Sequence, residues 1–114
     1  GEDFGGANQR KMPLTILTNV SEDMAAMQEE IFGPVLPVKG YRAVDEAIDY
    51  VNAHDRPLGL YYFGEDKTEQ ERVLSRTLSG GVTTNDVVFH VSMEDLPFGG
   101  VGPSGMGSYH AIEG

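Results

Sequence analysis

A carboxylate and an aromatic ring, those of Glu30 and Phe32, stand two residues apart in the run Gln28-Glu29-Glu30-Ile31-Phe32-Gly33-Pro34-Val35. In extended backbone, side chains at this spacing point to the same side. A carboxylate can accept hydrogen bonds from sugar hydroxyls, and an aromatic ring can pack on a flat heterocycle. The pair also fits a surface glutamate beside a core phenylalanine, and composition alone favours that plainer interpretation.

A second group of candidates is the segment Asn85-Asp86-Val87-Val88-Phe89-His90, which follows a short strand-like run. In open parallel sheets, ligands bind beyond the carboxyl ends of the strands. A simple connecting loop fits the segment equally well. His90 by itself is weak evidence for catalysis or metal binding, and His54 and His110 form no metal-ligand spacing with it.

A third candidate is the glycine-rich run from Leu96 to Gly107. Glycine lets backbone approach a ligand closely and can cradle a phosphate. The run lacks the lysine of a phosphate-binding loop, and no G-x-G-x-x-G stands between a strand and a helix. A tight structural loop is therefore the better interpretation.

The elements that position these residues alternate between strand and helix. Pro34 ends a short helix, because proline lacks an N–H and clashes with the preceding turn. Ser21 is expected to cap that helix, and Thr68 with Glu71 has the spacing of a capping box at the start of another. The expected strands are 14–20, 35–41, 60–63 and 82–84, and the expected helices are 21–29, 45–53 and 68–78.

This alternation predicts an α/β fold, part of an open parallel sheet with helical crossovers. The sequence indicates no domain boundary within residues 1–114. The chain begins without methionine and stops just after its glycine-rich run, so we expect a piece of a longer protein.

The amino-acid composition limits the classes of partner that the chain is expected to bind. The net charge is −10, from 8 Lys+Arg and 18 Asp+Glu. We therefore expect neither nucleic acid nor an anionic membrane surface as a partner. No apolar stretch approaches the length of a membrane span, and no signal peptide is visible. The sequence has no cysteine, which excludes thiolate metal sites and disulfides and fits a reducing, cytoplasmic location.

Taken together, these segments resemble the C-terminal part of the catalytic domain of aldehyde dehydrogenases, and the class 3 branch most of all. The resemblance covers almost the whole chain, and the order and spacing of its pieces are specific. The matching pieces are Glu29-Glu30-Ile31-Phe32-Gly33-Pro34-Val35, Leu58-Gly59-Leu60-Tyr61, Ser79-Gly80-Gly81-Val82-Thr83-Thr84-Asn85-Asp86, Leu96-Pro97-Phe98-Gly99-Gly100 and Ser104-Gly105-Met106-Gly107.

The resemblance implies that the parent protein oxidises an aldehyde to a carboxylic acid with NAD or NADP, an aromatic aldehyde such as coniferyl aldehyde being one candidate. It places Glu30 on the nicotinamide ribose and Phe32 near the ribose and nicotinamide. Phe98 falls close to the aldehyde pocket. The loop that shapes the pocket corresponds to Asn85, Val88, Phe89 and His90.

The family uses a cysteine thiolate as nucleophile and a glutamate-activated water, and the resemblance puts both outside this chain. No catalytic residue and no metal ligand is therefore assigned within it. We expect the parent to be a homo-oligomer and the isolated chain to be inactive. A sheet cut from its neighbours exposes an edge, so the chain is expected to self-associate or to be partly disordered near 85–108. The competing hypothesis is a stand-alone small α/β binding module without catalysis.

Overall fold

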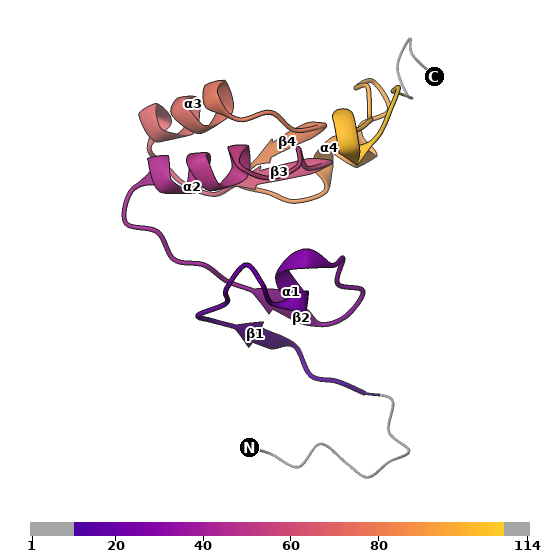
Figure 1. Ribbon diagram of the computed structural model, residues 1–114. Coiled ribbons are helices and arrows are strands. Elements are labelled where there is room, and N and C mark those ends of the chain that lie inside the picture. The colour runs from indigo at the N-terminus through magenta and orange to yellow at the C-terminus, as the bar shows by residue number, and fades with distance from the viewer. Residues whose placement is uncertain (1–10, 109–114) are drawn as a thin grey trace. The chain divides into compact units, whose positions relative to one another are not determined.

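The structure, a computed structural model, describes residues 11–108 and divides into two compact units between Gly40 and Tyr41 (Figure 1). The sequence had indicated no boundary at that point. His110, one of the histidines considered above, lies outside the described residues. Among those residues no helix is long and apolar enough to cross a membrane.

The first unit holds β1 (Thr15–Leu17), α1 (Ala25–Gln28) and β2 (Val35–Pro37). β1 and β2 pair in parallel, with Thr15 opposite Val35. β1 is shorter than predicted because Asn19 adopts a left-handed conformation, with φ of 55°, that turns the chain out of the strand. None of the described residues in this unit is buried.

α1 is shorter than predicted, and the expected cap at Ser21 is wrong. The helix begins after Met24, which provides no side-chain cap. The Ser21 hydroxyl donates instead to the Asp23 carboxylate, and that hydrogen bond lowers the pKa of Asp23. The Ser21 carbonyl accepts from the Met24 N–H at 3.1 Å, which makes a turn before the helix.

The second unit is built on a parallel pair of strands with two helices on one side. β3 and β4 pair with Gly59 opposite Gly81 and Tyr61 opposite Thr83. The prediction of parallel strands joined by helices is confirmed, although the described strands form two separate pairs. The elements are α2 (Val44–Asn52), β3 (Gly59–Tyr62), α3 (Lys67–Arg76), β4 (Gly81–Thr84), α4 (Phe89–Ser92) and a 3₁₀ turn (Gly102–Ser104).

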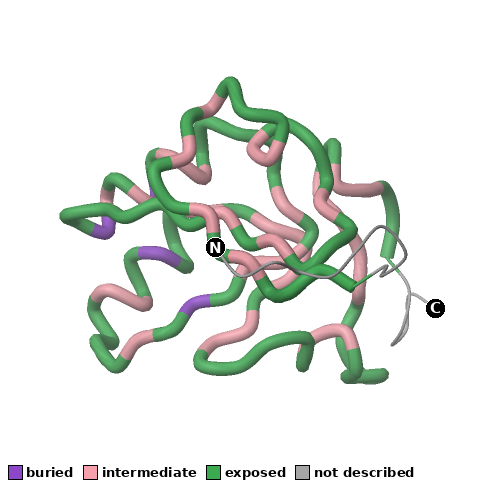
Figure 2. Tube along the Cα trace, turned by 90° about the horizontal axis from the view of Figure 1, so that it is seen from below, coloured by how far each residue is buried: buried purple, intermediate pink, exposed green. Residues whose placement is uncertain are grey.

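The core of the second unit is small. α2 contributes Val44 and Ile48, α3 contributes Val73, and β3 contributes Tyr62, with Leu60 packed against them. Val44, Ile48, Tyr62 and Val73 are the buried residues of this core, and Ile48 is only 1% exposed. Buried positions are purple in Figure 2 and are few. One face of the β3–β4 pair is thus covered by helices, as the amphipathic stripe of α2 predicts.

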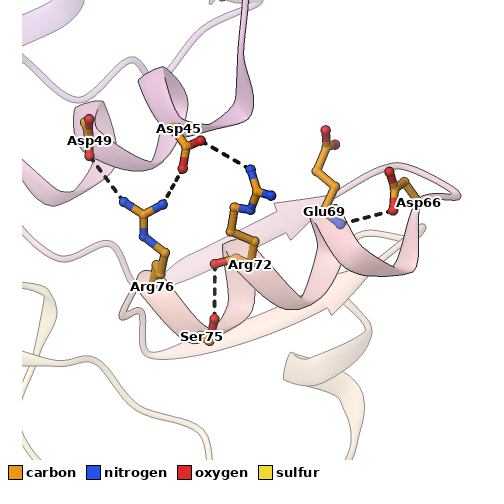
Figure 3. A network of polar contacts seen from close by, with 7 residues as sticks. All are labelled: Asp45, Asp49, Asp66, Glu69, Arg72, Ser75 and Arg76. Atoms are coloured by element: carbon orange, nitrogen blue, oxygen red, sulfur yellow. Dashed lines mark hydrogen bonds and ion pairs between the residues drawn. The ribbon is translucent and has the colours of Figure 1, made fainter.

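An exposed ionic network also joins the two helices (Figure 3). The Asp45 carboxylate pairs with Arg76 and, at 3.2 Å, with Arg72, and Arg76 reaches Asp49 at 3.8 Å. Ion pairs this exposed stabilise a protein by about 0–1 kcal/mol each. They orient α2 against α3, while the apolar contacts supply most of the stabilisation.

Two further details differ from the sequence-based expectation. The cap of α3 is Asp66, whose carboxylate accepts from the N–H groups of Thr68 and Glu69 at 2.8 and 3.2 Å. The predicted capping box at Thr68 is therefore wrong, because Asp66, two residues earlier, is the N-cap of α3 and satisfies these donors. α4 lies in a stretch expected to be loop, and four residues are too few to leave a periodic signal.

Candidate functional site

Glu30 and Phe32 occupy the corner between α1 and β2 in the first unit. The helix stops at Glu29, which is extended at φ −118° and ψ 150°. On the other side the Pro34 carbonyl accepts from the Thr15 N–H at 2.7 Å, so the corner is tied to β1. The end of α1 at Glu29 and the hydrogen bond at Pro34 therefore hold the turn of residues 29–34 between them.

Both candidate side chains at the corner face outward. Glu30 is exposed, and among the described residues no hydrogen bond or ion pair engages its carboxylate. The Phe32 side chain is 92% exposed. Burying an exposed phenylalanine side chain contributes about 1.5–3 kcal/mol. A partner that covered the Phe32 ring would gain this free energy. The corner thus presents a carboxylate that can accept hydrogen bonds from ribose hydroxyls and an aromatic face that can pack on a heterocycle.

Asn85 follows β4 in the second unit and bridges to the end of β3. Its N–H donates to the Tyr62 carbonyl at 2.7 Å, which extends the ladder by one bond. Its side-chain Oδ1 accepts from the Gly64 N–H at 2.9 Å, and its Nδ2 donates to the Gly64 carbonyl at 3.0 Å. The Asn85 amide therefore holds two strand ends together in this structure.

The chain turns sharply after Asn85. Asn85 and Val88 are both left-handed, with φ of 56° and 63°. This conformation is unusual for a β-branched residue such as Val88 and stores strain. Val88 immediately precedes α4, and its carbonyl accepts from the Val91 N–H at 2.9 Å. The turn sends α4 back toward β4, beside which it lies in Figure 1.

His90 is the residue of α4 that reaches the sheet. Its Nδ1 shares a hydrogen bond of 2.8 Å with the Thr83 hydroxyl. Its ring centroid lies 5.7 Å from that of Tyr61 and 6.0 Å from that of Phe98. A β-carbon on Gly81 would come within 2.5 Å of the His90 ring, so glycine at that position makes room for it.

A hollow of about 350 Å³ lies where α4 meets β4, a volume within the usual range of small-molecule sites. Of the predicted pocket residues, the structure places Phe89 and His90 in its lining, and Phe98 contacts the His90 ring. Asn85 and Val88 shape the turn instead. The lining residues are Val82, Thr83, Thr84, Asp86, Phe89, His90, Met93 and Leu96.

The glycine-rich run packs backbone against backbone. A β-carbon on Gly100 would lie 2.2 Å from the Ser104 carbonyl oxygen, and one on Gly80 would lie 2.2 Å from the Gly99 carbonyl oxygen. The Ser104 hydroxyl accepts from the Val101 N–H at 2.8 Å and donates to the Val101 carbonyl at 3.1 Å. The predicted tight structural loop is confirmed. The described residues contain no cluster of three or more His, Asp or Glu that could hold a metal.

Sequence reasoning missed the partners of His90. Thr83 and Tyr61 were predicted only as strand residues. A usable signal existed, because alternation places Gly81 and Thr83 on one face of β4, and a glycine beside a hydroxyl leaves space for a ring. Nothing in the sequence said which ring would fill it.

The chain belongs to the aldehyde dehydrogenase family, whose profile matches residues 1–114. It is 65% identical over 114 residues to the probable coniferyl aldehyde dehydrogenase of Caulobacter vibrioides, covering 100% of this chain and 24% of that protein. It is 49% identical over 106 residues to the dimeric NADP-preferring aldehyde dehydrogenase of Bos taurus, covering 93% of this chain and 44% of that sequence. Among solved structures, the substrate-bound state of Staphylococcus aureus AldH matches with a TM-score of 0.85 and 46% identity, covering 96% of this chain and 24% of that one.

These comparisons confirm the resemblance on which the sequence interpretation rested, including its leaning toward coniferyl aldehyde dehydrogenases. The chain spans about a quarter of the length of the first relative that it matches. A stand-alone binding module is not favoured, since the family profile extends across the whole chain.

Proposed function

We propose that the whole protein to which this chain belongs is an NAD- or NADP-dependent aldehyde dehydrogenase, and that the chain is a C-terminal segment of its catalytic domain. The observation that carries the proposal is the corner at Glu30 and Phe32, which presents a free carboxylate and a free ring within a chain matched to the family over its full length. The bovine relative is named as NADP-preferring, which supports this class of cofactor.

In this proposal the residues of this chain bind the cofactor and orient it. Glu30 accepts hydrogen bonds from the nicotinamide ribose, and Phe32 packs beside it. NAD or NADP, when bound, supplies the hydride acceptor for the oxidation. The sequence contains no cysteine, so the thiolate nucleophile of the family belongs to the rest of the protein, as does the general-base glutamate.

The aldehyde side of the proposal uses the second unit. Phe98, Phe89 and His90 offer aromatic surfaces, and Asn85 and Val88 set the turn that leads to Phe89 and His90. An aromatic aldehyde such as coniferyl aldehyde suits these surfaces, and the 65% identical relative is named as a probable coniferyl aldehyde dehydrogenase. A homo-oligomeric parent and a cytoplasmic location complete the proposal. A named dimeric relative supports the first, and the cysteine-free sequence is compatible with the second.

The test uses the full-length protein. With an aldehyde and NAD or NADP, purified parent should form reduced cofactor and the matching acid. Glu30→Gln should slow hydride transfer roughly tenfold, because a charge-assisted hydrogen bond becomes a neutral one. Pre-steady-state formation of reduced cofactor with a deuterated aldehyde measures that step.

Glu29→Gln is the matched control, since it makes the same chemical change at the neighbouring exposed residue. It should leave hydride transfer unchanged. Equal rates in the two variants would remove Glu30 from the cofactor site. The proposed activity would be contradicted if the parent formed no reduced cofactor with any aldehyde of a panel that includes aromatic and aliphatic ones.

A further inference from the structure

The β3–β4 pair has two faces, and His90 of α4 packs on the face that α2 and α3 do not cover. Register places Gly59 opposite Gly81 and Tyr61 opposite Thr83, so these four residues share one face. The other face carries Leu60 and Tyr62, which pack with α2 and α3. Parallel strands are normally covered on both sides.

The fit of His90 to this face is specific. Gly81 leaves a gap for the ring, because a β-carbon there would lie 2.5 Å from it, whereas one on Gly59 would make ordinary contact at 3.5 Å. Tyr61 flanks the ring, and Thr83 fixes its Nδ1 at 2.8 Å. The imidazole is therefore held by the space at Gly81, by one ring and by one hydrogen bond.

The same ring faces Phe98 with centroids 6.0 Å apart. Phe98 precedes Gly99 and Gly100, where an added β-carbon would lie 2.1 Å and 2.2 Å from neighbouring carbonyl oxygens, so the backbone there is closely packed. His90 thus contacts the strand pair and the segment of Phe98, and it follows the strained turn at Val88 by two residues. A change in the imidazole position would alter the lining of the hollow, to which His90 itself belongs, and would disturb the Phe98 ring beside it.

We propose that His90, held by Thr83, is a positioning residue that sets the shape of the aldehyde pocket and thereby the preference for aromatic over small aldehydes. This inference rests on the proposed aldehyde dehydrogenase activity. His90 acts through Phe98 and the turn, and it exchanges no proton with the substrate. Removal of the Thr83 hydroxyl frees the imidazole to rotate and leaves Nδ1 without that partner.

The test compares Thr83→Val and Thr83→Ser in the full-length protein. Valine keeps the shape and removes the hydroxyl, whereas serine keeps the hydroxyl. We expect Thr83→Val to raise KM for an aromatic aldehyde about fivefold, the equivalent of one hydrogen bond of about 1 kcal/mol. KM for acetaldehyde, KM for the cofactor and kcat should stay within about twofold, and Thr83→Ser should restore the aromatic KM.

A double-mutant cycle separates positioning from general loosening. His90→Phe also removes the hydrogen bond, so Thr83→Val should add little in that background. Thr77→Val is the matched control, because its hydroxyl bonds the Val73 carbonyl within α3 at 2.8 Å. It should change neither KM. Hydrogen exchange should quicken across Val87–Ser92 and Phe98–Val101 in Thr83→Val and remain unchanged in α2.

The outcomes are distinct. An inactive wild-type parent overturns the proposed function, and this inference with it. An active parent in which Thr83→Val raises KM equally for acetaldehyde and the aromatic aldehyde, or in which the two substitutions are additive, overturns the role of His90 alone. An unchanged aromatic KM in Thr83→Val does the same.

Discussion

The side-chain amide of Asn85 makes two hydrogen bonds to the backbone of Gly64, one through each of its polar atoms. Its φ of 56° is one that asparagine tolerates better than most residues. Two separate requirements, a left-handed backbone and an amide, thus meet at one position. Glycine would satisfy the first requirement alone.

Substitution of Asn85 in the full-length protein should therefore loosen the strand ends. Asn85→Asp replaces the Nδ2 donor with an oxygen that faces the Gly64 carbonyl, and we expect a cost of about 1–3 kcal/mol. Asn85→Gly, which keeps the backbone conformation, should cost less than Asn85→Ala. Hydrogen exchange at β3 and β4 reports these costs. Equal protection in all three variants would contradict the role of the Asn85 amide in holding the two strand ends together.

Tyr62 gives the second unit a pH dependence. Burial raises the pKa of Tyr62, and its hydroxyl also donates to the Glu69 carboxylate at 3.0 Å. The folded protein then keeps this proton at pH values where the unfolded chain has lost it. The contribution to stability is complete below the ordinary tyrosine value of about 10 and is lost as the pH rises through the higher folded value.

We predict that the urea midpoint of the wild type falls more steeply above pH of about 10 than that of Tyr62→Phe. Titration of tyrosinate absorbance should lose a step above the ordinary tyrosine value in the variant. Tyr41→Phe, at an exposed position, serves as the control. Parallel pH profiles for wild type and Tyr62→Phe would show that another group governs alkaline stability.

α3 begins with a side-chain cap, in contrast to α2. Asp66 accepts from two N–H groups at the start of α3, whereas Ala43 provides no side-chain cap to α2. Asp66→Ala should cost about 1 kcal/mol, and Asp66→Asn, an equally good cap, should cost little. Hydrogen exchange of the first turn of α3 measures both. A loss of protection in Asp66→Asn as large as in Asp66→Ala would point to charge rather than capping.

The elements that sequence predicted well are those with a repeating pattern. The apolar stripe of α2 and the β-branched or aromatic runs of β3 and β4 placed these elements to within a residue or two. α4 was missed because its position depends on the strained turn at Val88, and strain leaves no mark in composition. Asp66 was passed over as a cap because Thr68 and Glu71 matched a stronger motif.

For the candidate site, too, the features that follow from a local sequence pattern could be predicted, and the contacts that depend on the fold could not. Glu30 and Phe32 lie at a helix–strand corner as predicted, between the end of α1 at Gln28 and the start of β2 at Val35. Their roles toward a cofactor stay predictions. The contacts of His90 with Thr83 and Phe98, seven and eight residues away along the chain, arise because the turn at Val88 folds α4 back on β4, and no repeating pattern encodes them.

At the scale of the whole chain, the distribution of buried residues is uneven. Every buried residue of the core lies in the second unit, and the first unit has none among its described residues. Exposed apolar side chains of the first unit include Leu14, Ile16, Phe32 and Leu36. A strand pair without a core of its own is marginally stable at best in water. We expect these exposed apolar side chains to favour association.

We therefore predict that the isolated 114-residue chain self-associates and that its first unit exchanges amide hydrogens freely when dilute. Association should follow concentration, since it buries the exposed apolar residues. Sedimentation velocity with hydrogen exchange over a concentration series measures both effects, and Ile16→Lys should weaken the association while leaving α2 and α3 protected. The structure shifts the expected weak point from residues 85–108 to β1 and β2, because the later segment is tied to the sheet through Asn85, His90 and the packed glycines. A chain that stays monomeric at every concentration with β1 and β2 fully protected would contradict the dependence of the first unit on a partner surface.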